Sequence, residues 1–193
     1  MLLKDYIPGI KKKNSQFFFS GITFDSSKVK KNDIFFAIKG NNFDGNKFIP
    51  IAIKKGCRII VSEQKFKKKV KGIIIHTKNV RKLLAEVSSR IYKNRPKNLI
   101  AVTGTNGKSS VSDFYYQILK LNNRKVASIG TLGVRSDSVN FDLSHTTIDP
   151  INLGKIFNKL KKRGIQNVIM EASSHGLEQN RLDGLLFSLG IFT

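Results

Sequence analysis

The chain has 193 residues, of which 40% are hydrophobic and 25% are charged, a balance that is typical of a globular protein. It holds no apolar run of about 18 residues, and Asp5, Pro8 and Gly9 interrupt its first segment, so we expect no membrane insertion, no secretory leader and a cytoplasmic location. Cys57 is the only cysteine, which excludes an internal disulfide and a cysteine zinc cluster, and we expect it to pack as a small apolar side chain.

The net charge of +22 raises the question of nucleic-acid binding. Of the 35 basic residues 27 are Lys and 8 are Arg, whereas surfaces that read bases favour Arg. The excess lies in residues 1–97, which hold 24 basic and 6 acidic residues, and 16 Asn beside the 27 Lys favour a compositional bias of the source genome. We therefore predict that nucleic acid is not a partner, and keep a basic nucleic-acid-binding module only as an alternative function.

The first half alternates short apolar segments with helical patterns, which predicts an α/β domain. The apolar segments are residues 34–38, 59–61 and 73–75, and helices are expected near residues 47–55 and 80–92.

Pro96 cannot continue a helix and disfavours helical geometry in the residue before it. We place the boundary between two domains here, with residues 1–97 in the first domain and residues 98–193 in the second.

The second half begins with Leu99–Val102, an apolar segment typical of a strand buried on both faces of a parallel sheet. An amphipathic helix is expected at residues 108–121, and a second helix begins at Asp149 and Pro150. A further strand ends at Glu171. The alternation predicts an α/β domain with a mainly parallel sheet.

The turn between the first of these strands and its helix reads TGTNGKSS. Glycines let backbone N–H groups approach phosphate oxygens at the positive end of a helix, so we expect an ATP-binding loop there. Lys108 would reach the terminal phosphates and Ser109 would ligate Mg²⁺. The general P-loop pattern has Gly where this chain has Val102, so the loop is a shortened form. The expected ATP-binding residues are Gly104, Thr105, Asn106, Gly107, Lys108, Ser109 and Ser110.

Glu171 comes at the end of a predicted strand, at the carboxyl edge where open α/β sheets bind ligands. A carboxylate there can supply a second Mg²⁺ ligand beside Ser109. A helix-capping acid is the alternative that the spacing leaves open.

Four motifs in order carry a resemblance to the Mur ligase family: TFDSSKVKKNDIFFAIKGNNFDGNKFI, TGTNGKSS, SHTTIDP and EASSHGLEQNRLDG. Within the family, the third and fourth motifs resemble the members that add the third residue of the peptidoglycan stem peptide. The resemblance implies a UDP-sugar-binding domain followed by the first part of a P-loop ATPase domain. It implies catalysis by Lys108, with ATP and Mg²⁺ as cofactors, and a substrate, UDP-N-acetylmuramoyl-L-alanyl-D-glutamate, that joins to a diamino acid. The implied substrate-binding residues are Ser26, Asn41, Asn42, Phe43, Thr146, Thr147, Ser173, Gln179 and Arg181.

Three departures from the family pattern affect this expectation. Ser27 stands where the family has Arg, and Ile148 stands where it commonly has Pro. The sequence ends at Thr193, before the family's modified lysine and C-terminal domain, so we expect this chain alone not to ligate. We also expect it to be a monomer. Meso-diaminopimelate is favoured over L-lysine as the added residue. The alternatives within the class are a dipeptide-adding Mur ligase and a relative of folylpolyglutamate synthase.

Overall fold

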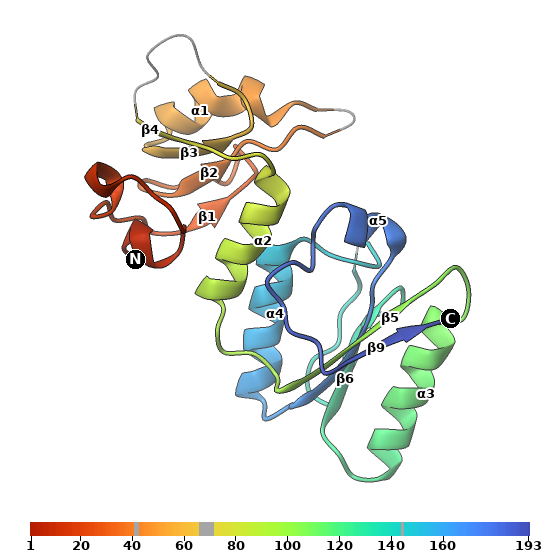
Figure 1. Cartoon of the computed structure of the whole chain (residues 1–193). Helices are drawn as coiled ribbons and strands as arrows, with labels where there is room; N and C mark the ends of the chain where they lie inside the picture. Colours follow the sequence, from red (N-terminus) through yellow and green to blue (C-terminus); the bar gives the residue numbers. More distant parts are fainter. Residues whose placement is uncertain (41–42, 66–71, 144) are drawn as a thin grey trace. The chain divides into compact units, whose positions relative to one another are not determined.

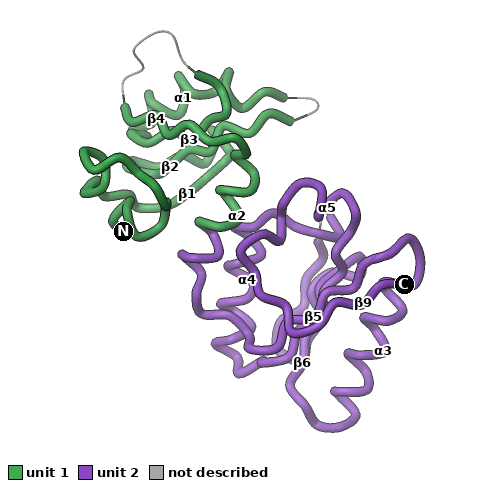
Figure 2. The backbone as a smooth tube through the Cα atoms, viewed as in Figure 1, with its two compact units in different colours: residues 1–87 green, residues 88–193 purple. Residues whose placement is uncertain are grey.

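The computed structural model describes residues 1–40, 43–65, 72–143 and 145–193, and its chain divides into two compact units (Figures 1 and 2). Unit 1 comprises residues 1–87 and unit 2 comprises residues 88–193. Both have mainly parallel sheets with helices, so the predicted α/β class is confirmed. In the described ranges, no helix has the length and apolar character needed to cross a membrane.

Unit 1 is built on a parallel sheet with the strand order β1-β2-β3-β4. Its elements in chain order are η1 (Leu3–Asp5), η2 (Lys12–Asn14), β1 (Ile22–Thr23), β2 (Ile34–Phe36), η3 (Gly45–Phe48), α1 (Ile49–Lys54), β3 (Ile59–Ser62) and β4 (Ile73–His76). Helix α2 (Val80–Ile91) follows and belongs to this unit up to Val87. The second and third strands are buried along their whole length, as continuous apolar runs in a parallel sheet require.

Cys57 lies in the core of unit 1, where it packs with Phe35, Ile49 and Ile60. Its thiol is 2% exposed and lies 3.1 Å from the carbonyl oxygens of Asp33 and Ile59. The prediction that it behaves as a small apolar residue is confirmed, and burial raises the pKa of its thiol.

The two units divide within α2, because the residues after Val87 pack inside unit 2. The Ser88 hydroxyl donates to the carbonyl of Pro150 over 2.8 Å, and the Ser89 hydroxyl donates to the carbonyl of Gly184 over 2.5 Å. The domain boundary that Pro96 suggested, at Lys97, stays a prediction.

Unit 2 has a sheet with the strand order β7-β6-β8-β5-β9, in which only β7 is antiparallel to its neighbour. Its strands are β5 (Asn98–Thr103), β6 (Val126–Gly130), β7 (Gly133–Ser136), β8 (Asn167–Glu171) and β9 (Leu189–Phe192), and its helices are α3 (Lys108–Leu121), α4 (Pro150–Lys162) and α5 (Ser174–Glu178).

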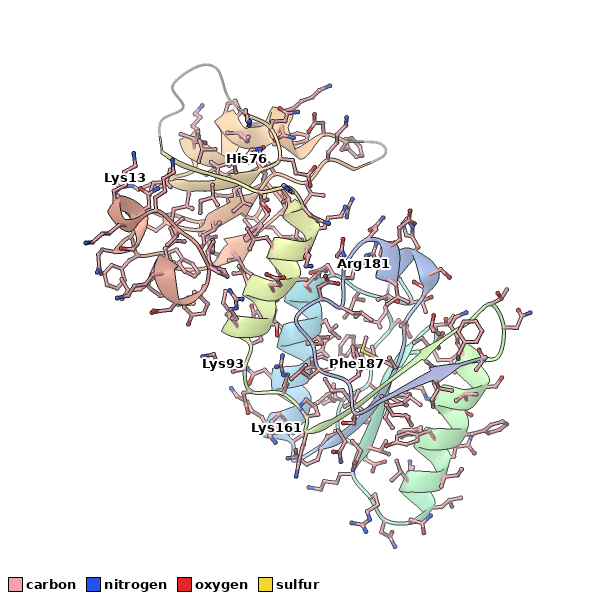
Figure 3. The ribbon with its side chains drawn as sticks, in the orientation of Figure 1. Lys13, His76, Lys93, Lys161, Arg181 and Phe187 are labelled. Carbon is pink, nitrogen blue, oxygen red and sulfur yellow. The ribbon has the colours of Figure 1, made fainter. Side chains whose placement is uncertain are left out.

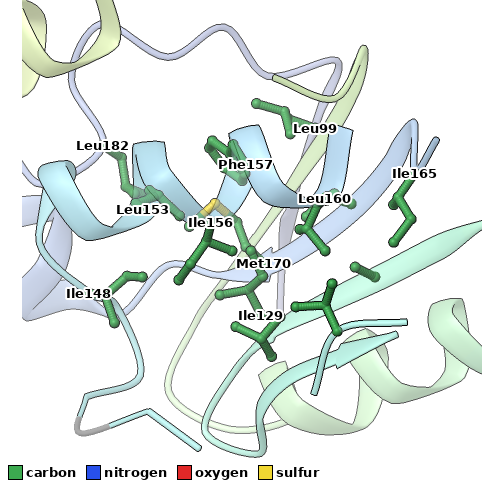
Figure 4. Close-up of a cluster of buried hydrophobic side chains, with 14 of the residues drawn as sticks. Leu99, Ile129, Ile148, Leu153, Ile156, Phe157, Leu160, Ile165, Met170 and Leu182 are labelled. Carbon is green, nitrogen blue, oxygen red and sulfur yellow. The ribbon is translucent and has the colours of Figure 1, made fainter. Parts of the chain in front are cut away.

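Helices α3 and α4 cover opposite faces of this sheet (Figure 1). The larger cluster packs α4 against the sheet through residues such as Leu153, Phe157 and Met170 (Figure 4). The Asp149 carboxylate caps α4 by accepting from the N–H groups of Ile151 and Asn152, each over 3.0 Å. The start predicted for this helix is therefore confirmed, and both faces of the sheet are closed.

Candidate functional site

The carboxyl ends of three neighbouring strands meet at one edge of the unit 2 sheet. Strands β6, β8 and β5 run parallel in that order, and Val102 is paired with Glu171. The loop that begins at Gly104 therefore follows β5 beside the end of β8, and Thr131 follows β6 on the other side of Glu171. This is the edge at which open α/β sheets place ligands.

The glycines of the loop have backbone geometry that other residues rarely adopt. Gly104 has a φ of 137° and Gly107 a φ of 80°. A Cβ at Gly104 would also overlap the backbone of Thr193, whose N–H donates to the Thr103 carbonyl over 2.9 Å. The glycine pattern thus fits a tight turn between β5 and α3, in addition to any role with phosphate.

Helix α3 starts directly at the end of the loop, with Gly107 as its N-cap. No side chain caps this end in the described parts of the chain, so the N–H groups of the first turn face the loop without a protein carboxylate or hydroxyl on them. The Lys108 ammonium donates to the carbonyls of Gly104 (2.6 Å) and Thr105 (3.0 Å). An ammonium and a helix N-terminus together form a site for an anion such as phosphate.

Glu171 is 2% exposed, yet it forms no ion pair among the described residues. Its two carboxylate oxygens instead accept from the N–H and the hydroxyl of Thr131, each over 3.0 Å. The carboxylate lies against the backbone of β6, since a Cβ at Gly130 would overlap it. The alternative role as a helix cap does not fit, because the helix that follows is capped by Ser173, whose hydroxyl accepts from Gly176 N–H over 3.1 Å.

Thr147 joins the backbone of β8 to the turn after it. Its hydroxyl, in a side chain that is 1% exposed, donates to the Glu171 carbonyl over 3.1 Å and accepts from Ser173 N–H over 2.9 Å. The hydroxyls of Thr147 and Ser173 lie 3.1 Å apart. Thr146 contacts the same region through Thr131, with 3.2 Å between the two hydroxyl oxygens.

Arg181 follows α5, and its position is labelled in Figure 3. Its guanidinium donates to the Thr147 carbonyl and, through Nη2 over 2.8 Å, to the Gln179 side-chain oxygen. Burial lowers the pKa of Arg181 and the Asp149 carboxylate opposes this shift, but a guanidinium keeps its charge at neutral pH. One hydrogen-bond network thus contains Glu171 and the five expected substrate residues of unit 2: Thr146, Thr147, Ser173, Gln179 and Arg181.

The expected nucleotide-binding residues of unit 1 are only partly described. Asn41 and Asn42 lie outside the described residues, whereas Phe43 is 74% exposed and Ser26 follows β1. The Lys55 ammonium donates to the carbonyls of Ser26 (3.0 Å) and Ser27 (2.6 Å). A cation therefore does reach this loop, although Ser27 stands where the resemblance implied Arg.

The Asp25 carboxylate orders the same loop by accepting from the hydroxyl of Ser27 over 2.7 Å and from its N–H over 2.8 Å. These bonds lower the pKa of Asp25, and the Lys28 ammonium at 3.2 Å acts in the same direction.

The described part of the chain contains no cluster of three or more His, Cys, Asp or Glu side chains suited to a metal ion. A Mg²⁺ site here would need oxygen ligands from few residues, which is usual for this ion when it also binds phosphate and water. Glu171 and Ser109 fit that requirement in chemistry: each oxygen of Glu171 accepts one bond from Thr131 and keeps a lone pair.

Thr131 is the residue of this network that the sequence reasoning missed. It lies directly after β6, a strand that the apolar pattern did not predict because Ser128 interrupts it. The signal that would have found it is its position at a strand's carboxyl end next to a glycine.

Comparison with known proteins agrees with the motifs. Residues 19–101 match the family model described as "Mur ligase family, catalytic domain", and residues 102–193 match "Mur ligase middle domain". Proteins named UDP-N-acetylmuramoyl-L-alanyl-D-glutamate--2,6-diaminopimelate ligase are similar to it. The one from Rickettsia montanensis is 44% identical over 177 residues, and the one from Rhizobium meliloti (strain 1021) is 38% identical over 173 residues. Each match covers 90% of this chain, but only 37% and 36% of the respective relative.

Solved structures show the same relationship. A structure with that same ligase name is 27% identical, has a TM-score of 0.83, and is matched by 100% of this chain over 40% of its own length. A MurF ligase from Thermotoga maritima in complex with ADP shares the fold, with a TM-score of 0.52, 24% identity, and coverage of 79% of this chain and 32% of that one. This chain spans a little over a third of the curated relatives it matches. With both family models matched in order across residues 19–193, the chain belongs to the Mur ligase family.

Proposed function

We propose that this chain supplies the UDP-sugar-binding and ATP-binding parts of a ligase that joins a diamino acid to UDP-N-acetylmuramoyl-L-alanyl-D-glutamate. Meso-diaminopimelate is the favoured diamino acid, because the relatives that are 38% and 44% identical carry 2,6-diaminopimelate in their names. Unit 1 would bind the nucleotide part of the substrate, and unit 2 would bind ATP, Mg²⁺ and the dipeptide part. The location would be the cytoplasm.

The observation that carries the proposal is the edge of the unit 2 sheet. The loop with Lys108 and the network around Glu171 follow adjacent strands. ATP, which donates the phosphoryl group, and the muramoyl dipeptide, which accepts it, would therefore meet at this edge. A loop alone would fit many nucleotide-binding proteins. The network of Thr147, Ser173 and Arg181 beside it supplies the polar groups that a second, anionic substrate needs.

In the proposed reaction, an oxygen of the D-Glu carboxylate attacks the γ-phosphorus of ATP, and ADP leaves. The amine of the diamino acid then attacks the acyl carbon, phosphate leaves, and the nitrogen loses a proton. Catalysis rests on positioning and on neutralising the phosphate charge. Lys108 would move from its two loop carbonyls to the terminal phosphates, which are stronger acceptors.

Mg²⁺, when bound, would neutralise phosphate charge and orient the phosphoryl group. Glu171 would hold it through a lone pair left over from its bonds to Thr131, and Ser109 through its hydroxyl. Arg181 would orient the dipeptide, since a guanidinium binds a carboxylate through two parallel hydrogen bonds.

Binding to the ¹⁵N-labelled 193-residue chain tests the proposal by NMR. Titration with a non-hydrolysable ATP analogue and Mg²⁺ is expected to shift the amides of residues 104–110, and UDP-muramoyl dipeptide is expected to shift those of Thr146, Thr147 and Ser173. UDP-muramoyl tripeptide is the comparison ligand, because it is the product of the proposed reaction and the acceptor that a dipeptide-adding ligase would use; it should bind no more tightly than the dipeptide.

If neither the ATP analogue nor the dipeptide shifts these amides at millimolar concentration, the proposed function of this chain is wrong. Tighter binding of the tripeptide would favour the dipeptide-adding alternative. A DNA oligonucleotide titrated over a salt series examines the nucleic-acid alternative, for which affinity should fall steeply with salt.

A further inference from the structure

Thr131 bonds to Glu171 through both its backbone and its side chain. The N–H of Thr131 donates to Oε1 of Glu171 and its hydroxyl donates to Oε2, each over 3.0 Å. Two bonds to two different oxygens fix both the position of the carboxylate and its rotation about the last side-chain bond. No other described side chain donates to this carboxylate.

The hydroxyl of Thr131 also lies 3.2 Å from the hydroxyl of Thr146. A threonine hydroxyl has one proton, and Thr131 uses it for the carboxylate, which can only accept. Thr146 must therefore be the donor in the pair. Both hydrogen bonds therefore point the same way: Thr146 donates to Thr131, and Thr131 donates to Glu171. This arrangement orients the Thr131 hydroxyl toward the carboxylate.

The space around Glu171 allows little freedom in the direction of β6. A Cβ at Gly130 would overlap the carboxylate, so the group lies in van der Waals contact with the backbone of that strand. Glu171 is 2% exposed, and its own backbone is fixed by pairing with Val102 in β5 and by the hydroxyl of Thr147. Of the described groups around the carboxylate, the Thr131 hydroxyl is the one that a single substitution removes without disturbing the strands.

We propose that Thr131 is a positioning residue, whose hydroxyl holds the Glu171 carboxylate in the orientation that binds Mg²⁺. This inference rests on the proposed function, in which Glu171 is a Mg²⁺ ligand. Partners that orient a metal ligand typically change metal affinity by 10- to 100-fold when they are removed, although they never contact the metal. Thr131 is itself exposed, so its hydroxyl can be removed without a cavity in the core.

The test compares Thr131→Val, which keeps the shape and loses the hydroxyl, with Thr131→Ser, which keeps the hydroxyl. Mg²⁺ is titrated into the ¹⁵N-labelled chain, with and without a non-hydrolysable ATP analogue, and the midpoint is read from the amides of Gly130, Glu171 and Ala172. We expect the midpoint to rise about 10-fold in Thr131→Val and to stay within about twofold of the wild type in Thr131→Ser. Analogue binding without Mg²⁺ should be equal in all three proteins, a result that a merely unstable variant would not give.

Each outcome separates this inference from the function on which it rests. If the wild type binds the analogue with a Mg²⁺ response and Thr131→Val has the same midpoint, only the inference is overturned. If the serine variant is as impaired as the valine variant, the hydroxyl is not the cause and the inference is again overturned. If the wild type binds the analogue but the Glu171 amide never responds to Mg²⁺, the inference is overturned and the assignment of the nucleotide loop is kept. If the wild type shows neither analogue binding nor a Mg²⁺ response, the inference and the proposed function are both overturned.

Discussion

Replacement of Thr147 by Val should destabilise unit 2 more than any other isosteric change at the site. The side chain is 1% exposed, and its hydroxyl bonds to the carbonyl of Glu171 and to the N–H and hydroxyl of Ser173, over 2.9 to 3.1 Å. Valine keeps the volume but leaves these groups without this partner. A buried polar group that loses its partner costs about 1–3 kcal/mol, so two backbone groups and a hydroxyl in partly buried positions give roughly 3 kcal/mol.

Urea denaturation followed by circular dichroism measures this loss, and hydrogen exchange of peptides from β8 assigns it to unit 2. For a domain of this size, about 3 kcal/mol lowers the melting temperature by roughly 10 °C or more. Thr146→Val is the matched control, because that side chain is only half-buried and, among the described residues, its hydroxyl bonds to the Thr131 hydroxyl. It should cost less than about 1 kcal/mol. If the two valine variants were equally stable, the buried hydroxyl would not be what holds the turn after β8.

Three further predictions follow from the site and the core. Lys108→Ala should weaken binding of an ATP analogue by roughly 10- to 100-fold, which corresponds to the loss of a charged hydrogen bond. The control, Lys155→Ala on the exposed side of α4, should leave the affinity measured by calorimetry unchanged. Glu171→Gln should raise the Mg²⁺ midpoint more than about 10-fold and change Mg²⁺-free nucleotide binding little; an unmoved midpoint would make Glu171 a structural residue. Cys57 should react slowly with iodoacetamide at neutral pH in the folded chain, because burial raises the pKa of its thiol and the reactive thiolate forms only as the pH rises past that value. Mass spectrometry should show a faster reaction in urea, and equal rates in the folded and unfolded chain would contradict the burial of Cys57.

The sequence predicted best those elements in which the local pattern and the tertiary position agree. Leu99–Val102 became the centre of β5, and the helix expected at residues 108–121 has those bounds. The strand expected at residues 34–38 ends at Phe36, because the Ile38 carbonyl accepts from Gly45 N–H over 2.9 Å and the chain leaves the sheet. That bond joins residues that no short-range pattern connects.

Among the strands of unit 2, β6, β7 and β9 were not predicted, and the reason differs between them. Ser128 interrupts the apolar run of β6, although the strand is buried along its whole length. Gly133–Ser136 has no apolar run and is a strand because it pairs antiparallel with β6. Leu189–Phe192 is apolar but mostly exposed on the edge of the sheet beside β5. Pairing with a neighbour, rather than local pattern, determines all three.

The residues of the candidate site also differ in how far the sequence could predict them. The glycine loop and Glu171 came from the residues themselves, since each has a chemical reason to stand at the end of a strand. The expected substrate-binding residues of unit 2 came from the family resemblance, because a lone Thr or Ser carries no signal of its own. Thr131 came from neither, because its role depends on β6.

The side-chain carboxylate and the backbone carbonyl of Glu171 each accept hydrogen bonds from segments in other parts of unit 2. Thr131 binds its carboxylate and Thr147 binds its carbonyl, while Thr146 and Arg181 in turn bind those two threonines. A dipeptide that contacts Thr146 or Arg181 would therefore act on the orientation of Glu171 through only one intermediate residue. Any such effect must be reciprocal: if the dipeptide favours the orientation that binds Mg²⁺, then Mg²⁺ strengthens dipeptide binding by the same factor. If the proposed function is right, the geometry of the sheet edge gives a physical reason why the phosphate donor and the acceptor would bind this site together.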